Sequence, residues 1–88
     1  MQRSPRRVTS ADLAVMVKAL QNRTEMVRGP LLRAQVDEFI STVGPLVNAD
    51  YVLRSAFAVA ASFCVLNQPE AALNHLIVSL CDYGTALP

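Results

Sequence analysis

The feature that most constrains this chain is a run of residues without charge in its second half. Residues 55–66 read Ser-Ala-Phe-Ala-Val-Ala-Ala-Ser-Phe-Cys-Val-Leu, and the uncharged stretch continues to residue 69. A helix that is apolar on all sides has to be covered on all sides. A domain of 88 residues buries only roughly 60–65% of the surface of its unfolded chain. We therefore expect part of the cover to come from another chain, as a homodimer or with a protein partner.

The composition excludes several other ways of stabilising so small a domain. Hydrophobic residues make up 52% of the chain, which has two cysteines and one histidine. These are too few for a disulfide scaffold or a structural zinc site, so no metal or cofactor is expected. The uncharged stretch falls short of the roughly 20 residues of a membrane-spanning helix. No signal peptide precedes it, so we expect a cytoplasmic protein that does not contact membranes.

The beginning of the first helix is marked by residues typical of a helix N-terminus. Thr9 and Ser10 are suited to the N-cap, and Asp12 favours the first turn. Apolar residues then recur at spacings of three and four, which places them on one helical face: Leu13, Met16, Val17 and Leu20. The face can extend to residue 26 or 27, although the polar residues after Gln21 also allow an end near residue 22.

Two Gly-Pro pairs mark the ends of the first and second helices. We expect Gly29 to follow the first helix and Pro30 to begin the second. Gly44 and Pro45 are expected to end the second helix in the same way, with glycine reversing the chain. One face of this helix is apolar, comprising Leu32, Val36, Phe39, Ile40 and Val43.

The last two helices are expected to be separated by a short Asn-Gln-Pro turn. Asn48 or Asp50 can cap the third helix, which should run to about residue 66. Asn67 is expected to cap the fourth helix, with Glu70 as its capping-box partner, and Gly84 to end it. The apolar spacing of the first helix returns here, in Leu73, Leu76, Ile77 and Leu80.

These elements predict an all-α fold with four helices in an orthogonal or bundle-like domain. Short connections favour antiparallel neighbours, so the last two helices should form a hairpin. The alternative is one continuous helix from Asp50 to Tyr83, kinked at Pro69. We expect a flexible basic arm at residues 1–8, a single domain at residues 9–84 with the third helix central, and a tail at residues 85–88.

Residues 51–83 resemble a single tetratricopeptide-type helical hairpin. Residues 66–80 carry the likeness, with the Asn-Gln-Pro turn, the small Ala72 and the final pair Ser79 and Leu80; Ala60 matches the small position of the first helix. Ala56 departs from the pattern because a large aromatic residue is typical there. The resemblance covers one repeat, whereas solenoids need about three. It implies peptide or protein binding without catalysis.

Charge is divided unevenly along the chain. Residues 1–33 hold seven basic and two acidic side chains, a balance of +5, and residues 34–88 have a balance of −4. This division predicts an acidic partner for the first half, mutual attraction between the halves, or ordinary solvated surfaces. The first helix combines an apolar face with most of the positive charge. We therefore expect a partner-binding set comprising Leu13, Met16, Val17, Leu20, Arg23 and Arg28, although the apolar members are equally suited to the core.

The residues capable of chemistry form no catalytic pattern. His75 is the only histidine, and we expect it on the surface, with Ser79 one turn away. Without a pocket or oxyanion donors these residues do not make a nucleophilic triad. Cys64 and Cys81 lie at different distances from the hairpin turn, which predicts two free thiols, and we expect both to be buried structural thiols. We expect no enzymatic activity.

The sequence therefore favours a small helical protein–protein interaction module. Concretely, we expect an adaptor, chaperone or antiactivator that sequesters a larger regulatory or secreted protein through an apolar helical face. The alternative is a small DNA-associated transcriptional regulator that uses the basic N-terminal half. That alternative is weaker because the third and fourth helices contain a single cation, Arg54, and a recognition helix is normally basic.

Overall fold

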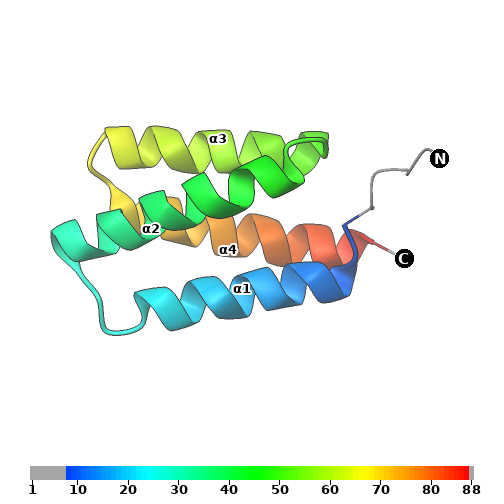
Figure 1. Ribbon diagram of the computed structural model, residues 1–88, viewed down its shortest axis with the longest axis horizontal. Coiled ribbons are helices and arrows are strands. Elements are labelled where there is room, and N and C mark those ends of the chain that lie inside the picture. Colours follow the sequence, from blue (N-terminus) through cyan, green and yellow to red (C-terminus); the bar gives the residue numbers. More distant parts are fainter. Residues whose placement is uncertain (1–7, 88) are drawn as a thin grey trace.

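The computed structural model describes residues 8–87, which form four α-helices and one short 3-10 helix (Figure 1). The bounds are α1 (Ser10–Thr24), α2 (Gly29–Val43), η1 (Gly44–Val47), α3 (Tyr51–Val65) and α4 (Pro69–Ala86). The predicted all-α fold is confirmed. The predicted arm lies outside the described residues except for Val8, which packs against the core.

The central helix of the bundle is α4, so the prediction that the third helix is central is wrong. In the described part of the chain α4 contacts α1, α2 and α3, whereas α1 and α3 do not contact each other (Figure 1). The run of residues without charge made the third helix look central. Many of its residues are alanine and serine, which occupy little volume and fill a core less than the leucines of α4.

The predicted hairpin of α3 and α4 is confirmed at its open end. The Oδ1 atom of Asp50 accepts a hydrogen bond from the N–H of Leu53 at 3.1 Å, which caps α3. The Oδ2 atom of the same carboxylate accepts a hydrogen bond from the hydroxyl of Tyr83 at 2.6 Å. A continuous helix would place these two residues about 50 Å apart at 1.5 Å per residue. The kinked-helix alternative is therefore wrong.

The first helix begins as expected and ends earlier than its apolar face suggests. Thr9 is the N-cap, and it exchanges hydrogen bonds with Asp12 in a capping box. The helix ends at Thr24, because Met26 adopts a left-handed conformation with φ of +62°. The N–H of Val27 donates to the carbonyl of Thr24 at 3.2 Å, which closes a tight turn.

The two Gly-Pro pairs differ from each other in conformation. Gly29 has φ of +60° and helps to reverse the chain, as expected. It is the first residue of α2, so the prediction that it directly follows the first helix is wrong. Gly44 is right-handed, with φ of −49°, and the chain continues into η1 without reversing. The prediction that Gly44 reverses the chain is therefore wrong. The extra turn of η1 places Val47 in the core before α3 begins.

Asn67 ends α3 instead of beginning α4. It adopts a left-handed conformation with φ of +60°. Its N–H donates to the carbonyl of Cys64 at 3.0 Å, and the N–H of Gln68 donates to the carbonyl of Phe63 at 2.8 Å. These two bonds form the Schellman motif of a helix C-terminus. The predicted capping box of Asn67 and Glu70 is therefore wrong, and Gln68 is the N-cap of α4.

This geometry predicts opposite effects for two substitutions at Asn67. We expect Asn67→Ala to lower the free energy of unfolding by about 1 kcal/mol, because alanine tolerates the left-handed region less well than asparagine. Asn67→Gly should be neutral or stabilising. Urea denaturation measures both effects, with Gln68→Ala as the control because no side-chain bond is lost there. Equal stabilities of the alanine and glycine variants would contradict this role.

Gly84 lies inside α4, so the prediction that it ends the helix is wrong. The helix continues to Ala86, and the expected tail therefore begins later than residue 85. Gly84 faces α1, where a Cβ atom would lie 3.6 Å from Cδ1 of Leu13. This is an ordinary van der Waals distance, so the site has room for alanine.

We expect Gly84→Ala to raise the free energy of unfolding by about 0.5–1 kcal/mol, because alanine loses less backbone entropy in a helix. The matched control is Gly29→Ala. At that position φ is +60°, so the same change should destabilise the fold. Thermal unfolding followed by circular dichroism measures both variants. A lower melting temperature for Gly84→Ala would show that the contact with α1 is tighter than described.

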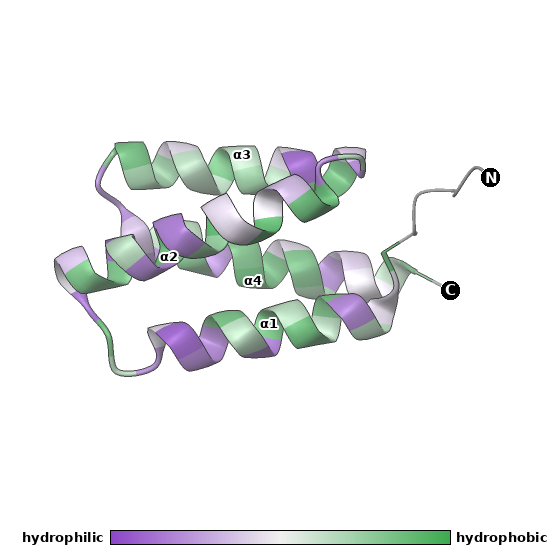
Figure 2. Ribbon diagram, viewed as in Figure 1, coloured by the Kyte–Doolittle hydropathy of each residue, from purple (hydrophilic) through white to green (hydrophobic). Residues whose placement is uncertain are grey.

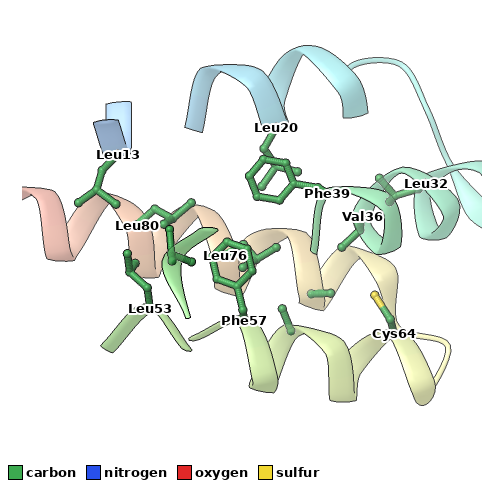
Figure 3. Packing of buried hydrophobic residues seen from close by; sticks show 13 residues of the cluster. Leu13, Leu20, Leu32, Val36, Phe39, Leu53, Phe57, Cys64, Leu76 and Leu80 are labelled. Atoms are coloured by element: carbon green, nitrogen blue, oxygen red, sulfur yellow. The ribbon is translucent and has the colours of Figure 1, made fainter. Parts of the chain in front are cut away.

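The core lies where α2, α3 and α4 meet, and α1 closes it from one side (Figure 3). The rings of Phe39 and Phe57 stack there, with centroids 5.9 Å apart. Leu76 and Leu80 of α4 are fully buried against them, and Leu20 of α1 completes the cluster.

Candidate functional site

The apolar residues predicted to bind a partner divide between the core and the surface. Leu13 and Leu20 are buried and belong to the core, which is the alternative that their spacing left open. They are therefore not available as anchors for a partner. Met16 and Val17 are half-buried at the edge of the core. Of this set, Val17 has the best position for binding, because it lines a groove beside α1.

The two arginines of the predicted site are exposed, but one of them is already paired. Arg23 of α1 contacts Glu38 of α2 at 2.6 Å, and Arg33 contacts Asp37 at 3.6 Å within α2. Arg28 is exposed at the N-cap of α2, away from the groove of α1. The two pairs support the prediction of attraction between the basic and acidic parts of the chain. They also reduce the positive charge that the first half presents to a partner.

The larger surface groove runs between α1 and α4 and has a volume of about 710 Å³. Leu13 and Leu80 contribute to its floor, and Gly84 leaves space because it has no side chain. Its remaining lining is small or polar, apart from Val17, and it contains one charged side chain, Lys18. The complete lining is Ser10, Leu13, Ala14, Val17, Lys18, Gln21, Asn22, Leu80, Cys81, Gly84 and Thr85.

The second uncovered surface is the outer face of α3. The helix buries one side, which comprises Leu53, Ala56, Phe57, Ala60 and Cys64. On its other sides, Val52, Val59, Val65 and Leu66 remain exposed. Figure 2 shows α3 mainly in hydrophobic and neutral colours, with hydrophilic colour near its beginning. These exposed residues agree with the expectation that the chain leaves part of its third helix uncovered.

A shallower groove of about 480 Å³ lies between α3 and α4 and contains His75. The imidazole is half-buried rather than on the open surface, and its ring centroid lies 6.2 Å from that of Phe63. Its Nε2 atom is 3.5 Å from Oγ of Ser79, at the limit of a hydrogen bond. Asp82 lines the same groove. His75, Ser79 and Asp82 all belong to one helix, and this arrangement does not define a catalytic site.

The two cysteines are free, as predicted, but the prediction that both are buried is wrong for Cys81. Cys81 is exposed, whereas Cys64 is buried between α2 and α3. Burial raises the pKa of the Cys64 thiol to about 11, and a hydrogen bond to Asp37 and the charge of that carboxylate add to the effect, while Arg33 opposes it. The thiolate is the nucleophilic form of cysteine. Cys64 is therefore a structural thiol.

The raised pKa predicts a loss of stability at alkaline pH. The folded chain holds the proton of Cys64 more tightly than the unfolded chain, whose thiol has a pKa near 9.0. This contribution to stability is complete below pH 9 and is lost as the pH rises to about 11. Urea denaturation across this range should show a smaller decrease for Cys64→Ala than for the unchanged chain. Cys81→Ser is the control. Its free energy of unfolding should decrease with pH as much as that of the unchanged chain.

Residues 8–87 offer no group of three or more His, Cys, Asp or Glu side chains that could hold a metal ion. None of the helices in that segment has both the length and the apolar character needed to cross a membrane. No protein-family model, curated protein or solved structure matches the chain. The likeness to a tetratricopeptide-type hairpin therefore rests on the residues of α3 and α4 alone.

Proposed function

We propose that this protein is a small helical adaptor that binds an amphipathic helix of another protein in the groove between α1 and α4. The groove itself carries the proposal, because its floor is apolar and residues of α1 and α4 alone line it. Binding of a helix in such a groove uses apolar anchors spaced three and four residues apart. The chaperone and antiactivator functions are versions of the same activity, in which the bound protein is held inactive.

The side chains of the groove indicate what kind of helix it accepts. Ala14 and Gly84 are small, so the backbone of a bound helix can approach closely. Val17 offers apolar contact above a floor of two buried leucines, Leu13 and Leu80, and Lys18 is the one charged residue. A partner helix with a small or medium apolar face and an acidic residue at its edge complements this lining. Its charge would act mainly on association rate and orientation.

Identification of the partner and a matched pair of variants test this proposal. The tagged chain is used to capture proteins from its native cell, and the captured protein is identified and titrated against the purified chain. We expect Ala14→Trp to weaken binding at least about tenfold, because the indole fills the groove. Ala34→Trp is the control, since Ala34 is exposed on α2 outside the groove. Equal affinities of the two variants would contradict the proposal.

A second pair of variants tests the charge of the groove. Lys18→Glu should weaken binding of the identified partner, and the difference should become smaller at high salt. Arg28→Glu makes the same change outside the groove and should have little effect. The purified chain should show no measurable affinity for arbitrary duplex DNA. Duplex binding that weakens steeply with salt would instead support the DNA-associated regulator.

A further inference from the structure

We propose that the outer face of α3 binds a second copy of the chain, with the two α3 helices antiparallel. The surface concerned is the α3 seam, which we define as Val52, Ser55, Val59, Ser62 and Leu66. It lies on the side of α3 away from the core residues of that helix. This inference goes beyond the proposed function, because it concerns a different surface and a different occupant.

The spacing along the α3 seam is that of a two-helix coiled coil. Val52, Val59 and Leu66 are seven residues apart, and their exposed fractions are 46%, 42% and 65%. Ser55 and Ser62 are also seven residues apart and are exposed. The two series together give the alternating three- and four-residue spacing of heptad positions a and d. The large residues of the seam, at positions 52, 59 and 66, are aliphatic. The residues between them, Ser55 and Ser62, are small.

This alternation of size selects the antiparallel orientation. Antiparallel helices place position a of one copy opposite position d of the other, so Val52 faces Ser62 and Val59 faces Ser55. Large side chains then fit beside small ones in four successive layers. Parallel helices would place serine opposite serine and leave unfilled space in those layers. The seam is therefore complementary to itself under two-fold symmetry, as an interface between identical chains requires.

The charge distribution also favours a second copy. Residues 55–69 contain no ionisable acid or base other than the buried Cys64, so two identical seams meet without repulsion between like charges. Asp82 of α4 lines the groove beside Val52, Ser55 and Val59, so a charge borders the seam but none lies within it. Arg54 lies beside the ring of Tyr51, 5.6 Å from its centroid, on another side of the helix. Apolar contact and matching of size are what the seam offers.

The mass of the purified chain in solution tests the proposal, and no other protein is needed. We expect light scattering at micromolar concentrations to give twice the chain mass of 9.6 kDa. Val59→Glu should raise the dissociation constant of the dimer at least about tenfold, because two carboxylates would meet near the symmetry axis. Val65→Glu is the control. It makes the same change on the same helix, outside the seam, at a residue that is 77% exposed.

Ser62→Arg provides a second variant if Val59→Glu fails to fold. Ser62 is exposed and its hydroxyl donates only to the carbonyl of Ala58, so the change should leave the monomer intact. It should weaken the dimer as Val59→Glu does. A monomer at all these concentrations, or a dimer that neither seam variant weakens, would overturn the proposal. Either result would leave the groove between α1 and α4 unaffected, and Ala14→Trp should not change the mass.

Cross-linking determines the orientation. Two single variants, Val52→Cys and Ser62→Cys, are prepared in chains that also carry Cys81→Ser, and they are then mixed and oxidised mildly. The antiparallel arrangement predicts a disulfide between the two different variants, and little cross-linking of either variant alone. Cross-linking of each variant with itself, without the mixed product, would indicate parallel helices and overturn the proposed packing.

Discussion

Ala60→Glu should lower the free energy of unfolding by about 3–5 kcal/mol, which is the cost of an uncompensated buried charge. Ala60 is fully buried in the core cluster that joins α3 to α4. The carboxylate would be held away from water without a basic partner, or would have to take up a proton. Domains of this kind are stable by only about 5–15 kcal/mol, so the change removes a large part of the total.

Urea denaturation measures this effect, and Ala34→Glu is the matched control. Ala34 is exposed on α2, so the same substitution at that position should change the free energy of unfolding by about 0.5 kcal/mol or less. The two variants share helix propensity and net charge, and burial is the difference between them. Similar stabilities would mean that Ala60 is not enclosed between α3 and α4.

The second large effect is expected for Leu76→Ala in the middle of α4. Leu76 is fully buried and belongs to the helix that contacts all three others. Truncation leaves a cavity and should lower the free energy of unfolding by about 2–5 kcal/mol. Because α4 is shared by the whole bundle, unfolding should remain a single transition in both fluorescence and circular dichroism.

Val78→Ala provides the comparison on the same helix. Val78 is two residues away and about half exposed, so its truncation should cost about 0.5 kcal/mol or less. An equal loss for Leu76→Ala and Val78→Ala would contradict the central position of α4. The loss of free energy of unfolding for Leu73→Ala should lie between the losses for these two variants, because Leu73 is only partly buried against the core.

The elements of this fold were predictable where local chemistry decides them. Thr9 and Asp12 form the capping box that their spacing allows, and the apolar faces of α1, α2 and α4 follow from periodicity. The hairpin was also predictable, because a proline two residues after Asn67 prevents a simple continuation of α3. The same proline also indicates where α4 begins. Pro69 is favoured at the first position of a helix, which leaves the N-cap to Gln68 and frees Asn67 to end α3.

The central position of α4 could not be predicted, because it depends on packing volume. An uninterrupted apolar run indicates that a helix avoids water, but it does not say which neighbours cover it. Gly84 is a similar case. A glycine near the end of an apolar face is typical of a helix stop, whereas in the structure α4 continues through Gly84 to Ala86.

The candidate site was predicted in part. Periodicity identified the apolar face of α1, but a periodic face is the same whether it is covered by the chain itself or by a partner. Val17 lines the groove and Leu13 is buried in its floor, whereas Leu20 belongs to the core alone. The contribution of α4 to the groove was missed, and Leu80 and Gly84 gave no signal for it in the sequence. Val17 and Leu80 are about 60 positions apart in the chain, and they share that surface only because α1 and α4 pack together.

The carboxylate of Asp50 has a consequence for the way this domain opens. One of its oxygens holds the first turn of α3, and the other holds Tyr83 in the last turns of α4. Fraying of the C-terminal end of α4 therefore removes a restraint on the residue that begins α3. The two segments should open together, as one cooperative unit, and the amide protons of both should exchange with solvent at related rates. Fraying of a terminus, usually a local event, is in this chain connected to the start of an internal helix.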